Sequence, residues 1–213
     1  MKKLVSILVL WAVVMVAPLS AAEADATNWY FGAGYLQSEA DTDIAGLTGT
    51  ASLDEKDSGF KIFGGYQFNP YLGLEMAYAD LGTVSLKGNN GDTFTYKGAA
   101  YSFTANNANL ELDTWVIEVG GKFSLPLDLV TGQDYLKYIT PFAKLGGFYW
   151  DQEATVTASG VNGGSISDDG FDFYFGAGLQ INIHKNFAIS GEWQRYTGDG
   201  SIDTYGANLI IRF

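Results

Sequence analysis

Charged side chains that could do chemistry occur at alternate positions of segments made otherwise of apolar and small residues. Carboxylates and amines in such places can act as general acids and bases, or can neutralise one another as buried ion pairs. Glu75 with Glu118 or Glu192 could form a carboxylate pair, but lysines share their face, so we interpret the set as ion pairs. The candidates are Glu75, Lys122, Glu118, Lys144, Glu192, Lys61 and Arg212.

Metal and cofactor chemistry finds little support in the residue types. The chain has no cysteine, which excludes a thiolate metal site and a disulfide framework. Asp41-Thr42-Asp43 and residues 168–170 resemble pieces of calcium loops, but they lack the regular spacing and the closing glutamate of such loops. Loose bridging of divalent cations by these acids is an alternative that the sequence leaves open. We predict no dedicated metal site and no cofactor.

The stretch 60–81 shows which elements must position the charges. Apolar residues recur at every second position, as at Leu72 and Leu74, and this period of two is typical of β-strands. Asn69-Pro70 separates the two arms, and both residue types favour turns. The stretch is predicted to be a β-hairpin with one apolar face and one small or polar face.

The same period of two recurs in short segments along the whole chain. The connections at about 38–59, 82–112 and 151–170 are long, and the interrupted alternation of the second favours strand extensions. Strands of roughly nine to twelve residues with alternating long and short connections are typical of membrane barrels. We predict an all-β fold, an eight-stranded antiparallel up-and-down transmembrane β-barrel. The predicted strands are residues 29–37, 60–67, 72–81, 114–125, 138–150, 171–183, 187–194 and 204–213.

The apolar face of these strands is predicted to contact lipid. The opposite face is rich in Gly, Ser, Gln, Asn and charges of both signs, which suits a narrow lumen filled by side chains. A soluble ligand-binding barrel would reverse this arrangement. Aromatic residues near both ends of the apolar face predict two interfacial belts. They are Trp29, Tyr66, Phe123, Phe187 and Phe213 at the turn end, and Tyr35, Phe60, Tyr78, Trp115, Tyr149 and Trp193 at the loop end.

The N-terminal segment has the pattern of an export signal. Two lysines precede an apolar run at residues 4–17, which ends in small residues. The run is shorter than the roughly 18 to 20 residues that span a bilayer, so we do not expect an anchor. The predicted domains are a signal peptide at residues 1–22, with cleavage after Ala22, Ala24 or Ala26, and an outer-membrane barrel at residues 23–213.

Acidic residues concentrate between the predicted strands. The formal net charge of −12 makes nucleic acid an unlikely class of partner. An even number of strands returns both ends of the barrel to one side, which we predict to be the periplasm, with the acidic loops outside the cell. The acids are Glu39, Asp41, Asp43, Asp54, Glu55 and Asp57 in the first long loop, and Asp151, Glu153, Asp168 and Asp169 in a later one.

Residues 63–76, FGGYQFNPYLGLEM, together with Asn28-Trp29-Tyr30 and the final Phe213, resemble the transmembrane domain of the outer membrane protein A family. The resemblance covers nearly all of residues 23–213. It implies a Gram-negative outer membrane, contact with lipid and lipopolysaccharide, and insertion by the barrel-assembly machinery. Many members continue into a peptidoglycan-binding domain, which we do not expect here. The assembly signal implied in the last strand is Phe213, Ile211, Leu209 and Tyr205.

The resemblance also implies an ion-pair cluster in the lumen. Glu75 and Lys122 match two of its positions and are therefore candidate partners, whereas Gln180 and Ser190 stand where the family has charged groups. Glu118, Lys144 and Glu192, on the same lumen face, are the candidate substitutes.

Three classes of function remain to be distinguished. We favour a monomeric barrel that serves envelope integrity and surface interaction through its acidic loops. A small diffusion pore is the alternative. An enzyme that modifies lipid A comes third, because the single histidine, His184, lies in a short periplasmic turn and cannot approach an acyl chain of the outer leaflet.

Overall fold

The computed structural model describes residues 28–133, 136–159, 161–198 and 200–213. The predicted signal peptide at residues 1–22 and its cleavage positions lie outside these residues. Eight long strands dominate the described part of the chain. They are β1 Trp29–Ala40, β4 Lys56–Asn69, β5 Leu72–Gly88, β8 Ala108–Ser124, β9 Ile139–Ala158, β10 Val161–His184, β11 Phe187–Tyr196 and β12 Ile202–Arg212.

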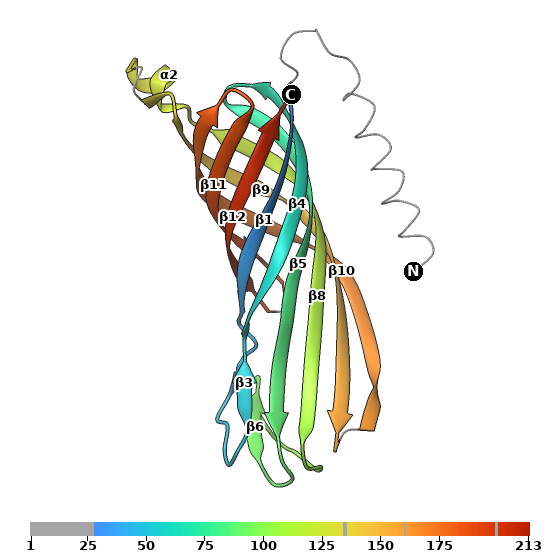
Figure 1. Cartoon of the computed structure of the whole chain (residues 1–213). Helices are drawn as coiled ribbons and strands as arrows, with labels where there is room; N and C mark the ends of the chain where they lie inside the picture. Colours follow the sequence, from blue (N-terminus) through green and yellow to red (C-terminus); the bar gives the residue numbers. More distant parts are fainter. Residues whose placement is uncertain (1–27, 134–135, 160, 199) are drawn as a thin grey trace.

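These eight strands of the described chain close into a ring (Figure 1). Each of β4, β5, β8, β9, β10 and β11 pairs antiparallel with the next of the eight strands, and β1 pairs with both β12 and β4. Closure leaves no strand edge to be buried unpaired in hydrocarbon. The predicted all-β fold, an eight-stranded antiparallel barrel, is confirmed.

Shorter elements decorate the two ends of the ring. One small sheet is built from β2, β6 and β7, while β3 extends the edge of β5. A single turn of helix, α2, lies in the connection between β8 and β9. No helix within the described residues is long and apolar enough to cross a membrane. The bounds are β2 Ile44–Ala45, β3 Ser52–Asp54, β6 Thr93–Tyr96, β7 Ala99–Ser102 and α2 Leu127–Thr131.

The turn between β4 and β5 forms as its residue types predict. The Asn69 side chain accepts hydrogen bonds at Oδ1 from the backbone N–H of Tyr71 at 2.9 Å and of Leu72 at 3.0 Å. This arrangement holds the chain in a turn, and Pro70 between them donates no ladder hydrogen bond. The strands then pair from Asn69↔Leu72 onward, so the turn sets which residues of β5 point into the barrel.

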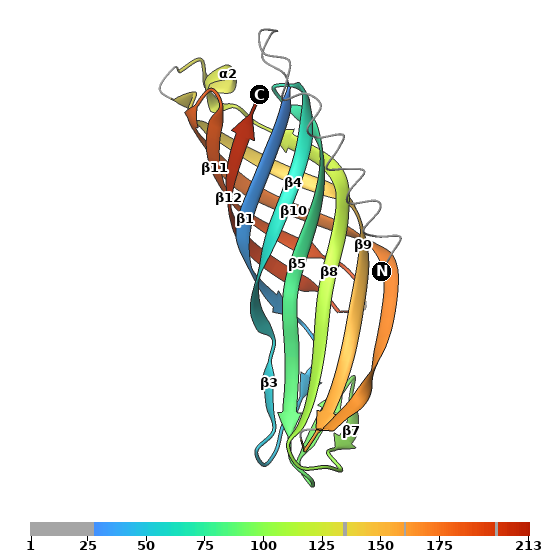
Figure 2. The same cartoon turned by 45° about the vertical axis from the view of Figure 1, so that its right-hand side comes forward.

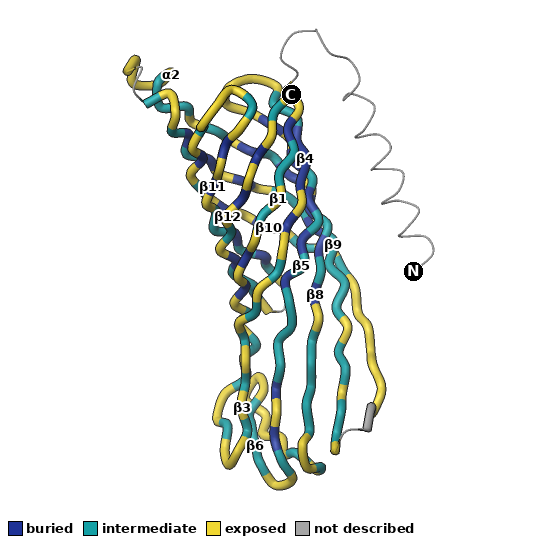
Figure 3. Tube along the Cα trace, viewed as in Figure 1, coloured by how far each residue is buried: buried dark blue, intermediate teal, exposed yellow. Residues whose placement is uncertain are grey.

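Burial alternates along the strands as the sequence predicts (Figure 3). On β5, Leu74 is 48% exposed and its neighbour Glu75 is 3% exposed; on β10, Leu179 is 43% exposed and Gln180 is 6% exposed. Apolar side chains therefore line the outside of the ring, and polar side chains are enclosed by it. This is the polarity expected of a barrel whose solvent is lipid.

Aromatic rings mark two levels on the outside of the barrel. At the loop end, the rings of Phe60, Tyr78, Trp115, Tyr149 and Phe171 form a series across five adjacent strands, with successive centroids 5.1 to 6.0 Å apart. Such rings prefer the interface between hydrocarbon and headgroups. At the short-turn end the ring pairs are Trp29 with Tyr66, Tyr66 with Phe68, and Phe31 with Phe213.

Four adjacent strands, β5, β8, β9 and β10, extend beyond the other strands of the barrel at the loop end (Figure 2). β5 and β8 have 17 residues each, β9 has 20 and β10 has 24, whereas β1, β11 and β12 have 12, 10 and 11. The strand extensions favoured by the alternation at 82–112 are present. We call the extensions the protruding sheet; its residues are 83–88, 108–113, 151–158 and 161–170.

The prediction of a loop at residues 151–170 is wrong. Asp151 and Glu153 lie on β9, and Asp168 and Asp169 lie on β10, in register with one another across the β9–β10 pair. The reason is that the outward face of a strand beyond the membrane meets water instead of lipid, so apolar residues are no longer favoured there. The apolar period of two that marks a strand at membrane depth therefore weakens, although the backbone ladder continues.

Polarity reverses between the barrel and the protruding sheet. Leu86 is buried and Leu110 and Leu112 are half-buried on the face that continues the lumen wall, whereas Glu111 and Asp113 are on the outward face. Outside the membrane, water replaces lipid as the solvent of the outward face, so burial of apolar area on the inner face stabilises the extension. The solvent outside each segment thus decides which face is apolar.

Candidate functional site in the barrel lumen

Five charged side chains meet midway along the lumen, and we call them the mid-lumen cluster: Lys61, Glu75, Glu118, Lys144 and Glu192. Lys61 Nζ lies 3.1 Å from Glu118 Oε2 and 3.3 Å from Glu192 Oε1. Lys144 Nζ lies 2.7 Å from Glu192 Oε2 and 2.5 Å from Glu75 Oε1. Each lysine therefore contacts two carboxylates, and Glu192 bridges both lysines.

The cluster joins strands that are not neighbours in the sheet. Lys61 on β4 contacts Glu118 on β8, and Lys144 on β9 contacts Glu75 on β5, so the ion pairs cross the lumen. All five side chains are buried, with 6% exposure or less. Buried charges are costly without partners, and here each has an opposite charge at contact distance.

Neutral groups complete the hydrogen bonding of the cluster. Tyr30 donates its hydroxyl to Glu75 Oε2 at 3.1 Å, and Tyr196 donates to Glu118 Oε1 at 2.5 Å. Lys61 donates to Gln194 Oε1 at 2.9 Å. These partners were not predicted from the sequence. The signal that could have found them is their place on the lumen-facing alternation of β1 and β11.

Aromatic side chains fill the lumen around the charges. Phe63 and Phe142 are buried, and each is paired in register with a glycine of the neighbouring strand. A Cβ placed on Gly32 would lie 2.1 Å from the ring of Phe63, and one on Gly178 would lie 2.4 Å from the ring of Phe142. The glycines of the lumen face therefore make room for rings, which leave a filled interior rather than an open channel.

Two of the predicted charges lie outside the mid-lumen cluster. Lys122 has no carboxylate within ion-pair distance among the described residues; it donates to Gln180 Oε1 at 3.2 Å and lies over the Phe142 ring at 4.7 Å. Arg212 donates to Asn182 Oδ1 at 2.7 Å. Glu75 contacts Lys144 rather than Lys122, so the candidate Glu75–Lys122 pair does not form.

A cavity of about 670 Å³ lies at the short-turn end of the lumen, and we call it the vestibule. Lys122 and Gln180 lie at its buried inner part, whereas Lys137 and Lys185 are exposed side chains at its rim. Tyr30 separates it from the mid-lumen cluster, because its ring lies under Lys122 and its hydroxyl donates to Glu75. The lumen thus has a filled middle and a hollow end.

The other candidate groups show simple local contacts. His184 ends β10, and its Nδ1 accepts a hydrogen bond from the backbone N–H of Asn186 at 3.3 Å. Within the part of the chain that the structure describes, no three His, Cys, Asp or Glu side chains lie together as metal ligands. At the loop end, hydrogen bonds from the Thr50 hydroxyl and the Asn89 backbone hold the pKa of Asp92 below its usual value.

The final strand presents its apolar residues outward. Phe213, Ile211, Leu209 and Tyr205 are all exposed on the lipid face, and β12 closes the ring against β1. Arg212 and Asn208, between them, point inward.

A closed antiparallel barrel with an apolar exterior, a charged interior and two aromatic levels defines a transmembrane barrel of the bacterial outer membrane. The chain belongs to the family of the outer membrane protein beta-barrel domain, whose sequence model matches residues 8–213. The resemblance to the outer membrane protein A family and the outer-membrane location in Gram-negative bacteria are confirmed.

Known proteins similar to the chain include outer membrane protein A from two species. That of Klebsiella pneumoniae is 30% identical over 197 residues, which are 88% of this chain and 48% of that protein. That of Salmonella typhi is 29% identical over 195 residues, which are 89% of this chain and 47% of that protein. The chain spans about half the length of these curated relatives.

A solved structure with a similar fold is Ail, the attachment invasion locus protein of Yersinia pestis. Its TM-score is 0.55 at 19% sequence identity, and the match covers 89% of this chain and 100% of that chain. Ail has also been solved in complex with sucrose octasulfate, a heparin analogue. At this identity the likeness shows a shared fold.

Proposed function

We propose that the protein is an envelope barrel that interacts with partners at the cell surface through its protruding sheet. The outward face of this sheet has five carboxylates that take part in no ion pair among the described residues. Unneutralised acids on one face attract a cationic partner. The five are Glu111, Asp113, Asp151, Glu153 and Asp169.

The register of the protruding sheet supports a partner of opposite charge. Asp113 is directly opposite Glu153, and Asp151 is directly opposite Asp169. Like charges opposite one another destabilise a sheet, so the arrangement costs free energy until a cation or a basic surface neutralises it. This register of like charges is the observation on which the proposal depends.

The open edge of β10 offers a second element of the same surface. β11 begins to pair with β10 only at Tyr174, so the ladder groups of Ser165, Ser167 and Phe171 have no described strand beside them on that side. An exposed strand edge can accept an extended peptide as an additional strand. A basic extended peptide could pair with the backbone of this edge and neutralise the carboxylates of the acidic face.

The experiment measures binding of poly-L-lysine to the whole protein in lipid nanodiscs, with heparin as the polyanion for comparison. We expect poly-L-lysine to bind, with affinity that falls as salt rises, because the contact is between exposed charges. Asp113→Asn with Glu153→Gln should weaken it about tenfold, equivalent to about 1.4 kcal/mol. Glu39→Gln, which alters an acid already paired with Lys56, is the matched control.

Heparin binding that exceeds poly-L-lysine binding and is unaffected by the double variant would overturn the proposal. The acidic face predicts that this chain differs in ligand charge from Ail, which was solved with a sulfated sugar. The comparison therefore tests a property of this sequence rather than of the fold.

The topology that goes with this function places the protruding sheet outside the cell and the short turns in the periplasm. An epitope inserted at Asn186 should remain unlabelled on intact cells, whereas protease should cut near Asp54 to Asp57. We further propose that residues 1–22 are removed on export, that the barrel at 23–213 is a monomer, and that β12 with the Phe213 that follows it is recognised by the barrel-assembly machinery. Labelling at Asn186 on intact cells would reverse the topology.

The pore and the enzyme are supported less well by the geometry. Ion pairs and aromatic rings fill the middle of the lumen, so steady, large, ion-selective conductance of purified protein in a planar bilayer is not expected and would favour a pore. His184 lies at the short-turn end, away from the protruding sheet, which argues against acyl chemistry in the outer leaflet. A change in lipid A mass on expression would support the enzyme.

A further inference from the structure

The vestibule has an excess of positive side chains in a chain whose net charge is −12. Four cations line the cavity, and Asp128 of α2 is the one carboxylate side chain among its described lining residues. The four cations are Lys122, Lys137, Lys185 and Arg212. The local charge is thus opposite in sign to that of the whole protein.

Amides rather than carboxylates surround the inner cations. Lys122, which is 4% exposed, donates to Gln180; the Gln180 amide donates to Asn182 Oδ1 at 2.9 Å, and Arg212 donates to the same oxygen at 2.7 Å. Amide oxygens satisfy hydrogen bonds without neutralising charge. Neither Lys122 nor Arg212 therefore has a carboxylate at ion-pair distance among the described residues.

Lys122 also retains hydrogen-bonding capacity. A lysine ammonium has three donors, and Gln180 Oε1 is the only acceptor recorded for Lys122 among the described residues. The rings of Tyr30 and Phe142 cover other sides of the ammonium at 5.0 and 4.7 Å. The remaining open side is the vestibule, which Lys122 lines.

We propose that the vestibule binds a phosphate group, with Lys122 at its inner end, Arg212 beside it, and Lys137 and Lys185 at the rim. Arginine and lysine together bind phosphate oxygens through charge-assisted hydrogen bonds, and Arg can do so with two parallel donors. The cavity of about 670 Å³ is within the usual range for small-molecule sites and exceeds the size of phosphate alone. The phosphate belongs either to a soluble phosphorylated compound or to a phospholipid headgroup at the barrel rim.

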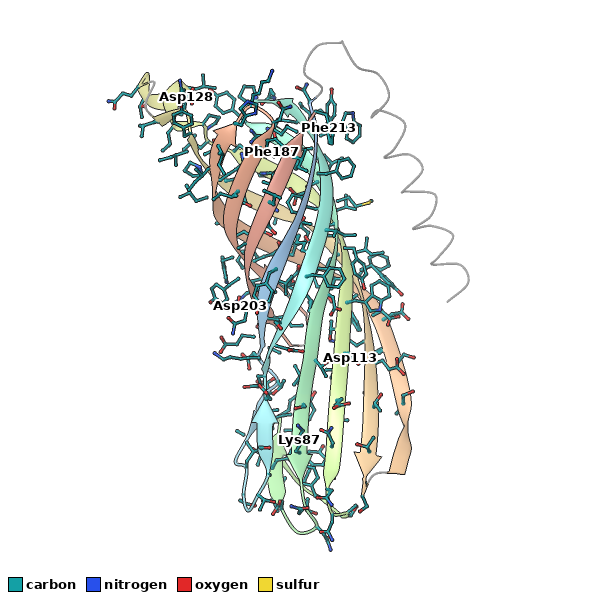
Figure 4. All side chains as sticks on the ribbon, viewed as in Figure 1. Lys87, Asp113, Asp128, Phe187, Asp203 and Phe213 are labelled. Atoms are coloured by element: carbon teal, nitrogen blue, oxygen red, sulfur yellow. The ribbon has the colours of Figure 1, made fainter. Side chains whose placement is uncertain are left out.

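The experiment titrates pyrophosphate into the whole purified protein in a maltoside detergent, which contains no phosphate, and measures heat by calorimetry. We expect saturable binding that Lys122→Met weakens about tenfold or more, since it removes the buried charge. Lys87→Met is the matched control, because Lys87 is exposed at the opposite end from Asp128 and Phe213 (Figure 4). Circular dichroism confirms that both variants are folded.

Nanodiscs distinguish the two sources of phosphate. If phosphatidylglycerol in the nanodisc competes with pyrophosphate where phosphatidylcholine does not, the headgroup is the ligand. If pyrophosphate binds equally in both lipids, the ligand is soluble. Absence of saturable binding by the wild type, or equal weakening by Lys122→Met and Lys87→Met, would overturn the proposal. Neither result depends on the protruding sheet or its cationic partner.

Discussion

The mid-lumen cluster and the inner end of the vestibule hold lysines at similar burial but in opposite electrostatic settings. Lys61 and Lys144 each contact two carboxylates, whereas Lys122 contacts a neutral amide. In the mid-lumen cluster, two lysines hold three carboxylates by ion pairs and hydrogen bonds, which makes a rigid plug without unpaired charges. Unpaired charges facing a cavity retain an interaction free energy that a ligand can use. One lumen therefore has a structural region and a region available for binding.

Lys144→Met should have the largest effect, because it leaves Glu75 without a lysine and Glu192 with only Lys61. We expect a loss of about 3 to 5 kcal/mol in the free energy of unfolding, typical of breaking a buried pair. Urea titration in lipid vesicles, followed by tryptophan fluorescence, measures it. Adding Glu75→Gln should restore part of the loss. A loss no larger than that of Lys122→Met would remove the distinction between the two regions.

Leu179→Arg tests whether the outer face of the vestibule wall contacts lipid, since Leu179 is the outward-facing neighbour of Gln180. An arginine on the lipid face should cost about 2 to 4 kcal/mol if it lies near the bilayer midplane. The same urea titration applies, with Leu179→Met as a control that keeps the residue apolar. Unchanged stability in lipid would mean that this face of β10 does not contact hydrocarbon.

Asn182→Leu tests whether the vestibule amides support the cations there. The change removes the acceptor of both Gln180 and Arg212, and unsatisfied buried donors cost roughly 1 to 3 kcal/mol. Thr140→Val, which removes one hydroxyl partner of Asn182, should cost less. Equal stability of Asn182→Leu and wild type would show that water accepts hydrogen bonds from Gln180 and Arg212 as well as the Asn182 amide does.

Lys122→Met should have the smallest effect, below about 1 kcal/mol, since losing the bond to Gln180 is offset by removing a buried charge that has no counter-ion. The measurement is again unfolding in vesicles. A loss as large as that of Lys144→Met would indicate that Lys122 is paired in the membrane, contrary to its contacts here. This variant must stay folded for the pyrophosphate experiment to be informative.

The alternation of residue types determined most of the barrel. A period of two on β5 and β10 assigns Leu74 and Leu179 outward and Glu75 and Gln180 inward, because successive side chains of a strand point to opposite faces. The turn at Asn69 could be predicted for a similarly local reason, since its side chain accepts hydrogen bonds from the backbone N–H groups of Tyr71 and Leu72. Neighbouring residues along the chain are sufficient for such inferences.

Strand length beyond the membrane was decided by pairing rather than by pattern. Asp168 and Asp169 lie on β10 because β9 supplies backbone hydrogen-bonding partners as far as Ala158. These residues do not contact lipid, so their sequence lacks the apolar alternation that marks a strand at membrane depth. The backbone hydrogen bonds of a partner strand are invisible in a single segment of sequence. The acidic face of the protruding sheet, with Asp113 opposite Glu153, likewise exists only in the paired register.

The partners of the lumen charges were decided by the closed ring alone. Sequence alternation places Glu75, Lys122 and Lys144 on one face, but β9 reaches β5 only across the lumen, and there Lys144 contacts Glu75. Lys122 lies on β8, next to β5, yet it contacts Gln180 of β10 at the short-turn end. Contacts across a barrel depend on its diameter, strand tilt and register together, and none of these is a property of one strand.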